Sequence, residues 1–509
     1  MVWTGQEIVT ATAAAGDAAE VARMECETVC TDSRRAGPGS LFIALRGERH
    51  DAHAFLAEAL RGGAAALLVE RVPDDIDRRR ALVVRDTLRG LGDLAAYTRV
   101  RWGGPVVAIT GSNGKTTTKE MVAAICETAL REGSKDARGR GFKQSTRNKR
   151  LLDLSHPRTL TPSLLKTHAN ENNLIGLPLT LLRLTGDEAV AVLEMGMNAP
   201  GEIARMTEIA TPDVGLITNV GPAHLEGLGS VAGVAAAKGE LVAGLRSDAT
   251  FAFNRDDEWV VRVARDFRGR RIEFGNGGEV AASAIDDRGA DGIAFTLQVG
   301  AVAERVVLRM PGRHNVQNAL GAAAVAHALG IAPAAIAAGL AAADAPKMRL
   351  QVSRLANGVT VINDAYNANP ASTMAAIDTL AHMPGRSIAV LGEMRELGAE
   401  SAALHRQVGA HAAARGVHWL LVVGPQADDI AAGAHEWKKA SSSAAAAALD
   451  VSICADAASA AALIMQRWQS GDTVLIKGSR GPDDEEGVRR YGARMAEVAA
   501  RLEVAGGRS

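Results

Sequence analysis

Residues 106–118 read VVAITGSNGKTTT, and this stretch decides the fold of the middle of the chain. Residues 106–109 form a short apolar run rich in β-branched residues, which is typical of a buried parallel strand. Residues 111–114 then predict a tight turn. Apolar residues recur after the turn at helical spacing, at Met121, Val122, Ile125 and Cys126. The stretch therefore predicts a strand, a glycine-rich turn and a helix.

This predicted turn has the chemistry of a phosphate-binding loop. Backbone N–H groups and the positive end of the helix dipole meet there, Lys115 adds a charge, and the Thr116 hydroxyl can bind Mg²⁺. The usual spacing G-x-x-x-x-G-K-[ST] is not met, because Ile109 stands six positions before Lys115. The alternative is an ordinary strand–turn–helix with an incidental lysine. We expect the phosphates of ATP to be held by Gly111, Ser112, Asn113, Gly114, Lys115, Thr116 and Thr117.

The composition describes a protein of several domains without a charge excess. A chain of 509 residues is too long for one hydrophobic core, and its net charge of −1 gives no reason to expect nucleic-acid or membrane binding. No apolar run approaches the ~20 residues that cross a bilayer, and no signal peptide is visible. The four scattered cysteines favour free thiols over a zinc site. We expect a cytoplasmic protein, and a monomer because no long heptad or exposed apolar stripe is evident.

The pattern of apolar runs predicts an α/β protein of three domains, at residues 1–103, 104–346 and 347–509. The first is a small α/β unit, the second a P-loop-type parallel sheet with helices on both faces, and the third a Rossmann-like doubly wound sheet. Strand-like runs lie at 40–45, 65–69 and 81–84 in the first unit, at 106–110, 189–194, 214–220 and 250–254 in the second, and at 360–363, 387–391, 419–423 and 473–476 in the third.

Four further segments of the second unit carry local signals. Residues 231–245 and 314–329 predict helices. Apolar and polar residues alternate over 293–310, which predicts a small antiparallel part of a sheet. Residues 131–166 are basic and weakly periodic, so we expect a surface loop there.

Polar residues at predicted strand ends are candidates for a site, because ligands of open parallel sheets bind beyond the strands' carboxyl ends. Glu194 ends an apolar strand, where Mg²⁺ beside ATP would compensate its charge; an N-cap or a surface salt bridge is the alternative. His224 comes after the next predicted strand, and it is either a residue of the site or a structural histidine that is hydrogen-bonded in a loop. For Lys238, composition alone favours a solvent-facing residue. Asn318 lies one turn after Asn315, and such an amide can read adenine or cap the helix.

Three polar loops follow predicted strands of the third unit and together indicate a second binding face. One loop alone would be explained by turn chemistry. The loops are at residues 363–370, 392–398 and 477–481.

These motifs resemble the Mur ligase family, the ATP-dependent amide ligases of peptidoglycan precursor synthesis. The resemblance covers nearly the whole chain. The loop TGSNGKTTT is shared with folylpolyglutamate synthetases and is specific only to the superfamily. The more specific stretches are TDSRRAGPGSLFIALRGERHDAHAF, NNLIGLPLTLLRL, EMGMNAPGEI, TNVGPAHLEGLGS, AAKGEL, NDAYNANPAS and LGEMRELG.

The resemblance implies a ligase that uses ATP and Mg²⁺ to join D-Ala-D-Ala to UDP-MurNAc-tripeptide through an acyl phosphate. Lys115, Glu194, His224 and Lys238 would be its catalytic residues. Metal would be held by Thr116, Glu194, His224 and a carboxylated Lys238. The nucleotide would also touch Asn318, Arg349 and Asp364. The UDP-muramyl part would contact Ser33, Arg34 and Arg46, and the dipeptide would lie near Tyr366, Asn367 and Asn369.

The chain departs from the family pattern at two small residues and in one length. Ala52 and Ala169 stand where the family usually has glycine, and the segment after the phosphate loop is about two dozen residues longer than usual. Two other functions stay open. A folylpolyglutamate-synthetase-like ligase is disfavoured by the long unit before the phosphate loop. A non-catalytic nucleotide-sugar-binding regulator is disfavoured by the joint presence of the four catalytic candidates.

Overall fold

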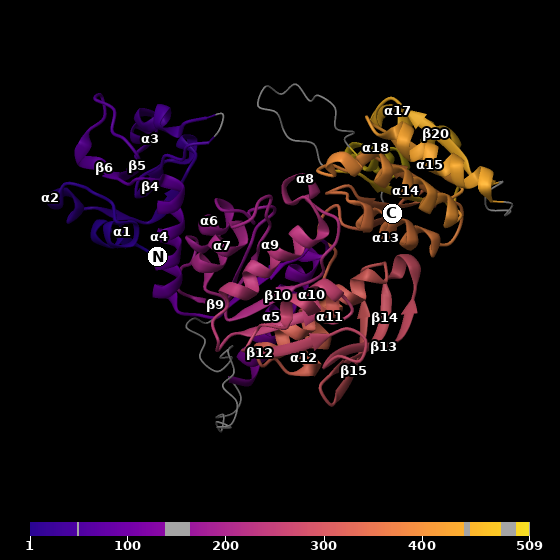
Figure 1. The fold of residues 1–509 in the computed structure, drawn as a ribbon, viewed down its shortest axis with the longest axis horizontal. Coiled ribbons are helices and arrows are strands. Elements are labelled where there is room, and N and C mark those ends of the chain that lie inside the picture. The colour runs from indigo at the N-terminus through magenta and orange to yellow at the C-terminus, as the bar shows by residue number, and fades with distance from the viewer. Residues whose placement is uncertain (48–49, 138–162, 442–447, 480–494, 508–509) are drawn as a thin grey trace.

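The computed structural model describes residues 1–47, 50–137, 163–441, 448–479 and 495–507. It has the expected α/β architecture, with one main sheet inside each of the three predicted units (Figure 1). Where one unit ends and the next begins stays our proposal, with divisions at 103/104 and 346/347. In the described ranges, no helix combines the length and the apolar character needed to cross a membrane.

The N-terminal unit is built on a four-stranded parallel sheet of order β3-β4-β5-β6. Its last helix, α4, packs against the central unit, where Arg99 pairs with Asp213 at 3.0 Å and donates to the Ala210 carbonyl. The elements are β1 (Trp3–Thr4), α1 (Gly5–Thr12), α2 (Ala18–Val21), β2 (Glu25–Cys26), β3 (Thr28–Cys30), β4 (Ser40–Ile43), α3 (Leu56–Gly62), β5 (Ala66–Val69), β6 (Ala81–Val83) and α4 (Thr87–Trp102).

The central unit is built on a nine-stranded sheet of order β15-β14-β13-β12-β11-β10-β7-β9-β8. Strands β8 to β12 are parallel with β7, and β13 to β15 extend the same sheet as an antiparallel piece. The strands are β7 (Val106–Thr110), β8 (Ser163–Lys166), β9 (Glu188–Glu194), β10 (Val214–Ile217), β11 (Thr250–Asn254), β12 (Arg270–Phe274), β13 (Val280–Asp287), β14 (Ile293–Val299) and β15 (Val302–Leu308).

Helices cover both faces of this sheet, as the sequence predicts. Successive side chains of β7 point to opposite faces: Val107 and Ile109 pack with α5, α11 and α12, while Val106 and Ala108 join a core that extends to α7, α9 and the N-terminal unit. The helices are α5 (Lys115–Ala137), α6 (Gly176–Leu181), α7 (Glu202–Ala210), α8 (Leu225–Leu228), α9 (Val231–Gly244), α10 (Glu258–Ala264), α11 (His314–Ala328) and α12 (Pro333–Ala342).

The expected surface loop at residues 131–166 is wrong at both of its ends. The helix α5 continues to Ala137, and residues 163–166 form β8, the edge strand beside β9. Lys166 pairs with Glu120 of α5 at 2.6 Å, so this basic end is ordered by an ion pair with a neighbouring helix. Residues 138–162 of the expected loop lie outside the described ranges.

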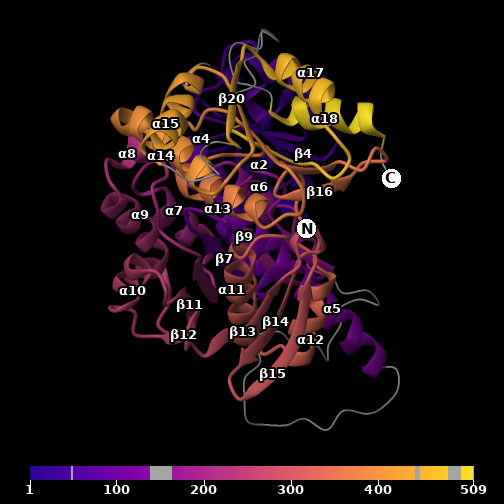
Figure 2. The same cartoon turned by 90° about the vertical axis from the view of Figure 1, so that its right-hand side faces the viewer.

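The C-terminal unit holds a six-stranded sheet of order β16-β17-β21-β18-β19-β20, parallel except for the edge strand β16. Figure 2 shows this unit, in orange and yellow, over one end of the central unit. The elements are β16 (Gln351–Arg354), β17 (Thr360–Asp364), α13 (Pro370–Ala381), β18 (Ser387–Leu391), α14 (Ser401–Ala414), β19 (Trp419–Val423), α15 (Ala427–Ala440), β20 (Asp450–Cys454), α17 (Ala457–Arg467), β21 (Thr473–Lys477) and α18 (Met495–Gly506).

Candidate functional site

A cavity of about 550 Å³ lies where the central and C-terminal units meet. Its walls come from the carboxyl ends of β7, β9 and β10 on one side and of β17 and β21 on the other. It brings together fourteen predicted site residues: Ser112, Asn113, Gly114, Lys115, Thr116, Thr117, Glu194, His224, Asn318, Arg349, Asp364, Tyr366, Asn367 and Asn369. Of the other predicted residues, Gly111 belongs to the same loop, Lys238 lies behind the cavity residue Met197, and Ser33, Arg34 and Arg46 lie on the N-terminal unit.

The phosphate loop is shaped by the neighbouring strand end. The Asn113 N–H donates to Asn219 Oδ1 at 2.9 Å, and the Ser112 N–H donates to the Asn219 carbonyl. Gly114 has φ +81°, and a Cβ there would collide with Asn318 Oδ1. The turn therefore requires glycine at this position both for its backbone conformation and for space.

We predict that Gly114→Ala weakens ADP binding at least about tenfold, because alanine is strained at φ +81° and either the loop or the Asn318 side chain must shift to relieve the collision. Calorimetric titration with ADP measures the change. Gly37→Ala is the control, since its Cβ would meet nothing within 4 Å. Equal ADP affinity in Gly114→Ala and the unmodified protein would contradict the account of the loop.

Lys115 projects into the cavity without a carboxylate in ion-pair contact, as far as the described residues go. Its ammonium donates to the Gly111 carbonyl at 2.7 Å. Burial lowers the pKa of Lys115, Arg349 lowers it further, and Glu194 opposes both. A bound triphosphate would be an anionic partner for this ammonium.

Glu194 is a buried carboxylate held by two neutral donors. Its side chain accepts from Thr116 Oγ1 and from Asn172 Nδ2, both at 2.8 Å, and the residue is 2% exposed. It is neither an N-cap nor a surface salt bridge in the described structure. A buried charge without a cation is costly, so this carboxylate fits a Mg²⁺ ion that would take its remaining ligands from phosphates and water.

His224 lies at the start of α8 in a left-handed conformation, with φ +55°. Its Nδ1 is 2.5 Å from Oε2 of Glu396, a residue of the C-terminal unit. This contact with His224 lowers the pKa of Glu396, and burial opposes the shift. The imidazole therefore lines the cavity and also joins the two units; its role as a metal ligand stays a prediction.

Lys238 is not a solvent-facing residue, and the expectation from composition is wrong. It lies on α9, as predicted, but is 1% exposed, and its Nζ is 3.6 Å from Sδ of the cavity residue Met197. Burial lowers its pKa well below the ordinary value, and the charge of Lys115 adds to the shift. The amine therefore lies behind the cavity wall, and its burial favours the neutral, unprotonated form.

Asn318 packs against the phosphate loop. Its Nδ2 donates to Asn315 Oδ1 at 2.9 Å, and its Oδ1 faces Gly114. Asn315 in turn donates to the Pro311 carbonyl and does not cap the helix. These contacts give the amides a role in shaping the loop, and the contact of Asn318 with adenine stays a prediction.

As far as the described residues go, the C-terminal unit presents two cations, Arg349 and Lys477, and the carboxylate of Asp364 to the cavity. The Arg349 guanidinium lies 4.2 Å from the centre of the Tyr366 ring, a cation–π distance. Asp364 accepts from the Leu350 N–H and pairs with Lys477.

Asn369 caps α13 and donates to Asn113 Oδ1 at 2.7 Å, so it binds the phosphate loop directly. Its predicted contact with the dipeptide stays untested.

The three predicted UDP-muramyl contacts lie in the N-terminal unit, away from the cavity. Ser33 donates to Glu58 at 2.9 Å, Arg34 pairs with Asp32 on the surface, and Arg46 is exposed. They are placed on the unit expected to hold that substrate, and their contacts with it stay predictions.

Ala169, where the family usually has glycine, adopts φ +47°. A residue with a side chain destabilises the folded state by about 1–2 kcal/mol in this conformation. Glycine instead lowers the free energy of unfolding by about 0.4–1 kcal/mol, because it gives the unfolded chain more conformational freedom. We predict that Ala169→Gly stabilises the protein by about 0.5–1 kcal/mol, measured by thermal unfolding. Ala36, with φ −65°, provides the control, since Ala36→Gly should destabilise. A lower unfolding temperature for Ala169→Gly would contradict this.

Four residues of the site were missed as individual candidates: Asn172, Asn219, Glu396 and Lys477. Lys477 directly ends a buried strand, and Asn219 follows one two residues on. The rule that identified Glu194 would therefore have identified Lys477, whereas Asn219 was missed because the expected strand at residues 214–220 ran past it. Asn172 lies in a loop without such a signal, and Glu396 lies in the predicted polar loop at residues 392–398, within which nothing distinguished it from its neighbours.

The chain matches two sequence families. Residues 109–326 match the Mur ligase middle domain, and residues 348–480 match the Mur ligase, glutamate ligase domain. It is 40% identical over 474 residues to the UDP-N-acetylmuramoyl-tripeptide–D-alanyl-D-alanine ligase of Escherichia coli K12, which covers 91% of this chain and 93% of that protein.

Solved structures agree with this similarity. A crystal structure of MurF from Acinetobacter baumannii gives a TM-score of 0.82 at 31% identity and covers 99% of both chains. MurF from Thermotoga maritima in complex with ADP gives a TM-score of 0.74 at 27% identity, over 93% of this chain and 98% of that chain.

Proposed function

The chain belongs to the Mur ligase family, and from this premise we propose that it joins D-Ala-D-Ala to UDP-MurNAc-tripeptide at the expense of ATP. The products are UDP-MurNAc-pentapeptide, ADP and phosphate. The observation that carries the proposal is the cavity itself, in which the phosphate loop of one unit faces the polar loops of another. Relatives of the stated activity that match over nine-tenths of the chain support it.

In the first step, the terminal carboxylate of the tripeptide attacks the γ-phosphorus of ATP, and the bond to the β–γ bridging oxygen breaks. The carboxylate thereby gains a good leaving group as an acyl phosphate. The loop N–H groups and Lys115 bind the triphosphate and offset the charge that spreads over the transferring group. The relative from Thermotoga maritima crystallised with ADP supports the use of ATP.

The residues around Glu194 fit a Mg²⁺ ion that accompanies the nucleotide. Glu194 and the hydroxyl of Thr116 would hold it, with His224 and a carboxylated Lys238 close to the same wall. When bound, the ion supplies charge neutralisation to the phosphates. The protein's part is to keep these donors dry and fixed.

In the second step, the amine of D-Ala-D-Ala attacks the acyl carbon, phosphate leaves, and the amine loses a proton. The loop of Tyr366, Asn367 and Asn369 forms the wall of the cavity opposite the phosphate loop, where the amine must approach. Contact between the units, through Asn369 with Asn113 and Glu396 with His224, excludes water that would hydrolyse the acyl phosphate.

The remaining assignments concern the surroundings of the reaction. Ser33, Arg34 and Arg46 hold the UDP-muramyl end on the N-terminal unit. The protein acts as a monomer in the cytoplasm, where ATP is available; its four cysteines are all free. Light scattering of the purified protein tests the monomer.

An ADP-release assay against a panel of acceptors tests the function and its alternatives. We expect ADP release only when UDP-MurNAc-tripeptide and D-Ala-D-Ala are both present. Release with a folate and glutamate instead would favour the folylpolyglutamate-type ligase. Binding of the nucleotide sugar without any ADP release would favour the non-catalytic regulator.

A further inference from the structure

Three loops meet at the carboxyl edge of the C-terminal sheet, and the middle one contacts both others. The strand order β17-β21-β18 places the loop after β21 between the loops at residues 364–369 and 392–398. The outer two reach the central unit: Asn369 donates to Asn113, and Glu396 contacts His224. Lys477 ends β21, at the base of the middle loop.

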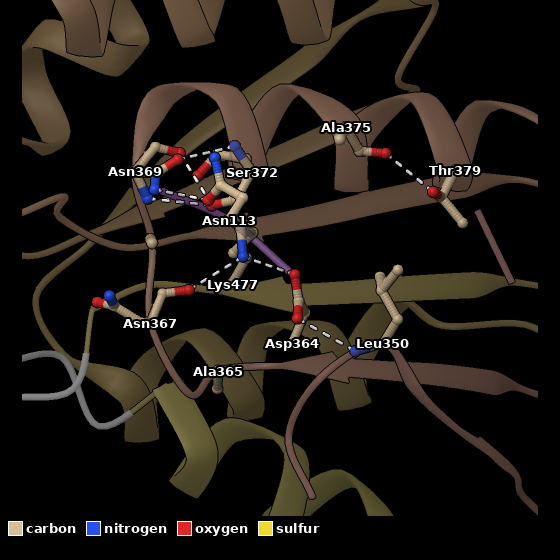
Figure 3. A network of polar contacts seen from close by, with 12 residues as sticks. Asn113, Leu350, Asp364, Ala365, Asn367, Asn369, Ser372, Ala375, Thr379 and Lys477 are labelled. Atoms are coloured by element: carbon tan, nitrogen blue, oxygen red, sulfur yellow. Dashed lines mark hydrogen bonds and ion pairs between the residues drawn. The ribbon is translucent and has the colours of Figure 1, made fainter. Parts of the chain in front are cut away.

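Lys477 holds the first loop at its base. Its ammonium is 2.6 Å from Asp364 Oδ2 and donates to the Asn367 carbonyl at 3.0 Å (Figure 3). The side chain of Lys477 is 3% exposed and that of Asp364 is 13% exposed. Removal of one partner of such a desolvated pair leaves a buried charge without compensation, so the position of Asp364 depends on this lysine.

The far end of the same loop is held by the phosphate loop. Asn369 accepts from the Ser372 N–H, donates to Asn113 Oδ1, and so joins the start of α13 to the central unit. The residues between Asp364 and Asn369 are thus fixed at one end by Lys477 and at the other by the nucleotide site.

Ser479 extends the connection to the second loop. Its hydroxyl donates to the Ala368 carbonyl at 3.2 Å and accepts from the Arg395 N–H, and its own N–H donates to the Glu393 carbonyl. One short segment after β21 therefore links both loops that touch the central unit.

We propose that Lys477 is a positioning residue of the ligase, which holds Asp364 and the loop of residues 366–369 in register with the phosphate loop. It acts through these groups on the nucleotide and on the incoming dipeptide, and it takes no part in bond making. This inference rests on the proposed function.

The test compares Lys477→Met with Arg386→Met. Arg386 pairs with the buried Asp472 at 2.7 Å, before the amino ends of β18 and β21, so the control breaks an ion pair at the opposite edge of the same strands. Both variants should unfold at lower temperature. Only Lys477→Met should raise the KM values for ATP and D-Ala-D-Ala, each about tenfold, with the KM for UDP-MurNAc-tripeptide within about twofold.

Unchanged KM values in a folded Lys477→Met, or an equal rise for all three substrates, would overturn the proposal. So would the same KM pattern in Arg386→Met, because general loosening of the unit would then explain it. If Lys477→Met does not fold, Ser479→Ala should raise the same two KM values about threefold, and unchanged values would overturn the proposal.

Titration with ADP separates failure of this inference from failure of the proposed function. Absence of turnover in the unmodified protein counts against the function alone. Weaker ADP binding by Lys477→Met than by the unmodified protein supports the positioning role even then, and equal binding overturns it.

Discussion

Replacement of Lys115 by alanine is expected to lower kcat for ADP release about 10³-fold or more. This ammonium is the positive side chain of the phosphate loop, and its partner within the described structure is the Gly111 carbonyl. It is therefore available to the transferring phosphoryl group, whose charge must be offset in a dry cavity. Alanine leaves the N–H groups of the loop but removes the full charge.

The ADP-release assay with both substrates measures this loss, and two controls isolate it. Lys166→Ala removes a lysine of the same unit that pairs with Glu120 at the sheet edge, so it should keep kcat within about twofold. The unfolding temperature of Lys115→Ala should not fall, because burial already makes the charged form of this lysine unfavourable in the folded protein. Near-normal turnover in Lys115→Ala would refute its role.

Replacement of Lys238 by arginine is expected to lower kcat about 10²–10³-fold. The side chain is buried beside Met197, and burial holds the pKa of its amine well below the ordinary value. A neutral amine can attack CO₂: the nitrogen–carbon bond forms, a proton leaves, and an anionic carbamate results. Such an anion favours a bound cation where an ammonium repels it. Arginine retains a positive charge and is not carboxylated in this way.

Carboxylation of Lys238 has a direct spectroscopic readout. After incubation with ¹³C-bicarbonate, the unmodified protein should show a carbamate carbon signal by NMR that Lys238→Arg lacks. Activity of the unmodified protein should also fall in buffer freed of CO₂. A fully active Lys238→Arg variant, or full activity without CO₂, would contradict the assignment.

The sequence predicts features that contiguous residues determine. The strand, turn and helix at residues 106–118 form as expected, because apolar period, glycine positions and helix start all agree in one short stretch. Strands with mixed composition were missed. β12 reads RRIEF and buries only alternate residues, and β20 reads DVSIC at the sheet edge. Their strand character comes from the neighbours with which they pair.

The contacts between units could not be predicted from one sequence. Asn113 and Asn369 are 256 positions apart, and Lys477 lies 113 positions after Asp364. Each is a polar residue in a loop or at the end of a strand, and nothing local indicates which of these segments face one another. The burial of Lys238 was missed for a related reason: α9 packs against α7 and α10, and its own sequence, apolar except for Lys238 and Glu240, does not indicate which side is buried.

The central claim is that this cavity energises an acid with ATP and joins it to a dipeptide. Mass spectrometry of a mixture of the protein, ATP, Mg²⁺, UDP-MurNAc-tripeptide and D-Ala-D-Ala tests it most directly. We predict UDP-MurNAc-pentapeptide, with one ADP and one phosphate for each molecule formed. Consumption of ATP without a joined product, or no consumption with both substrates present, would contradict the claim.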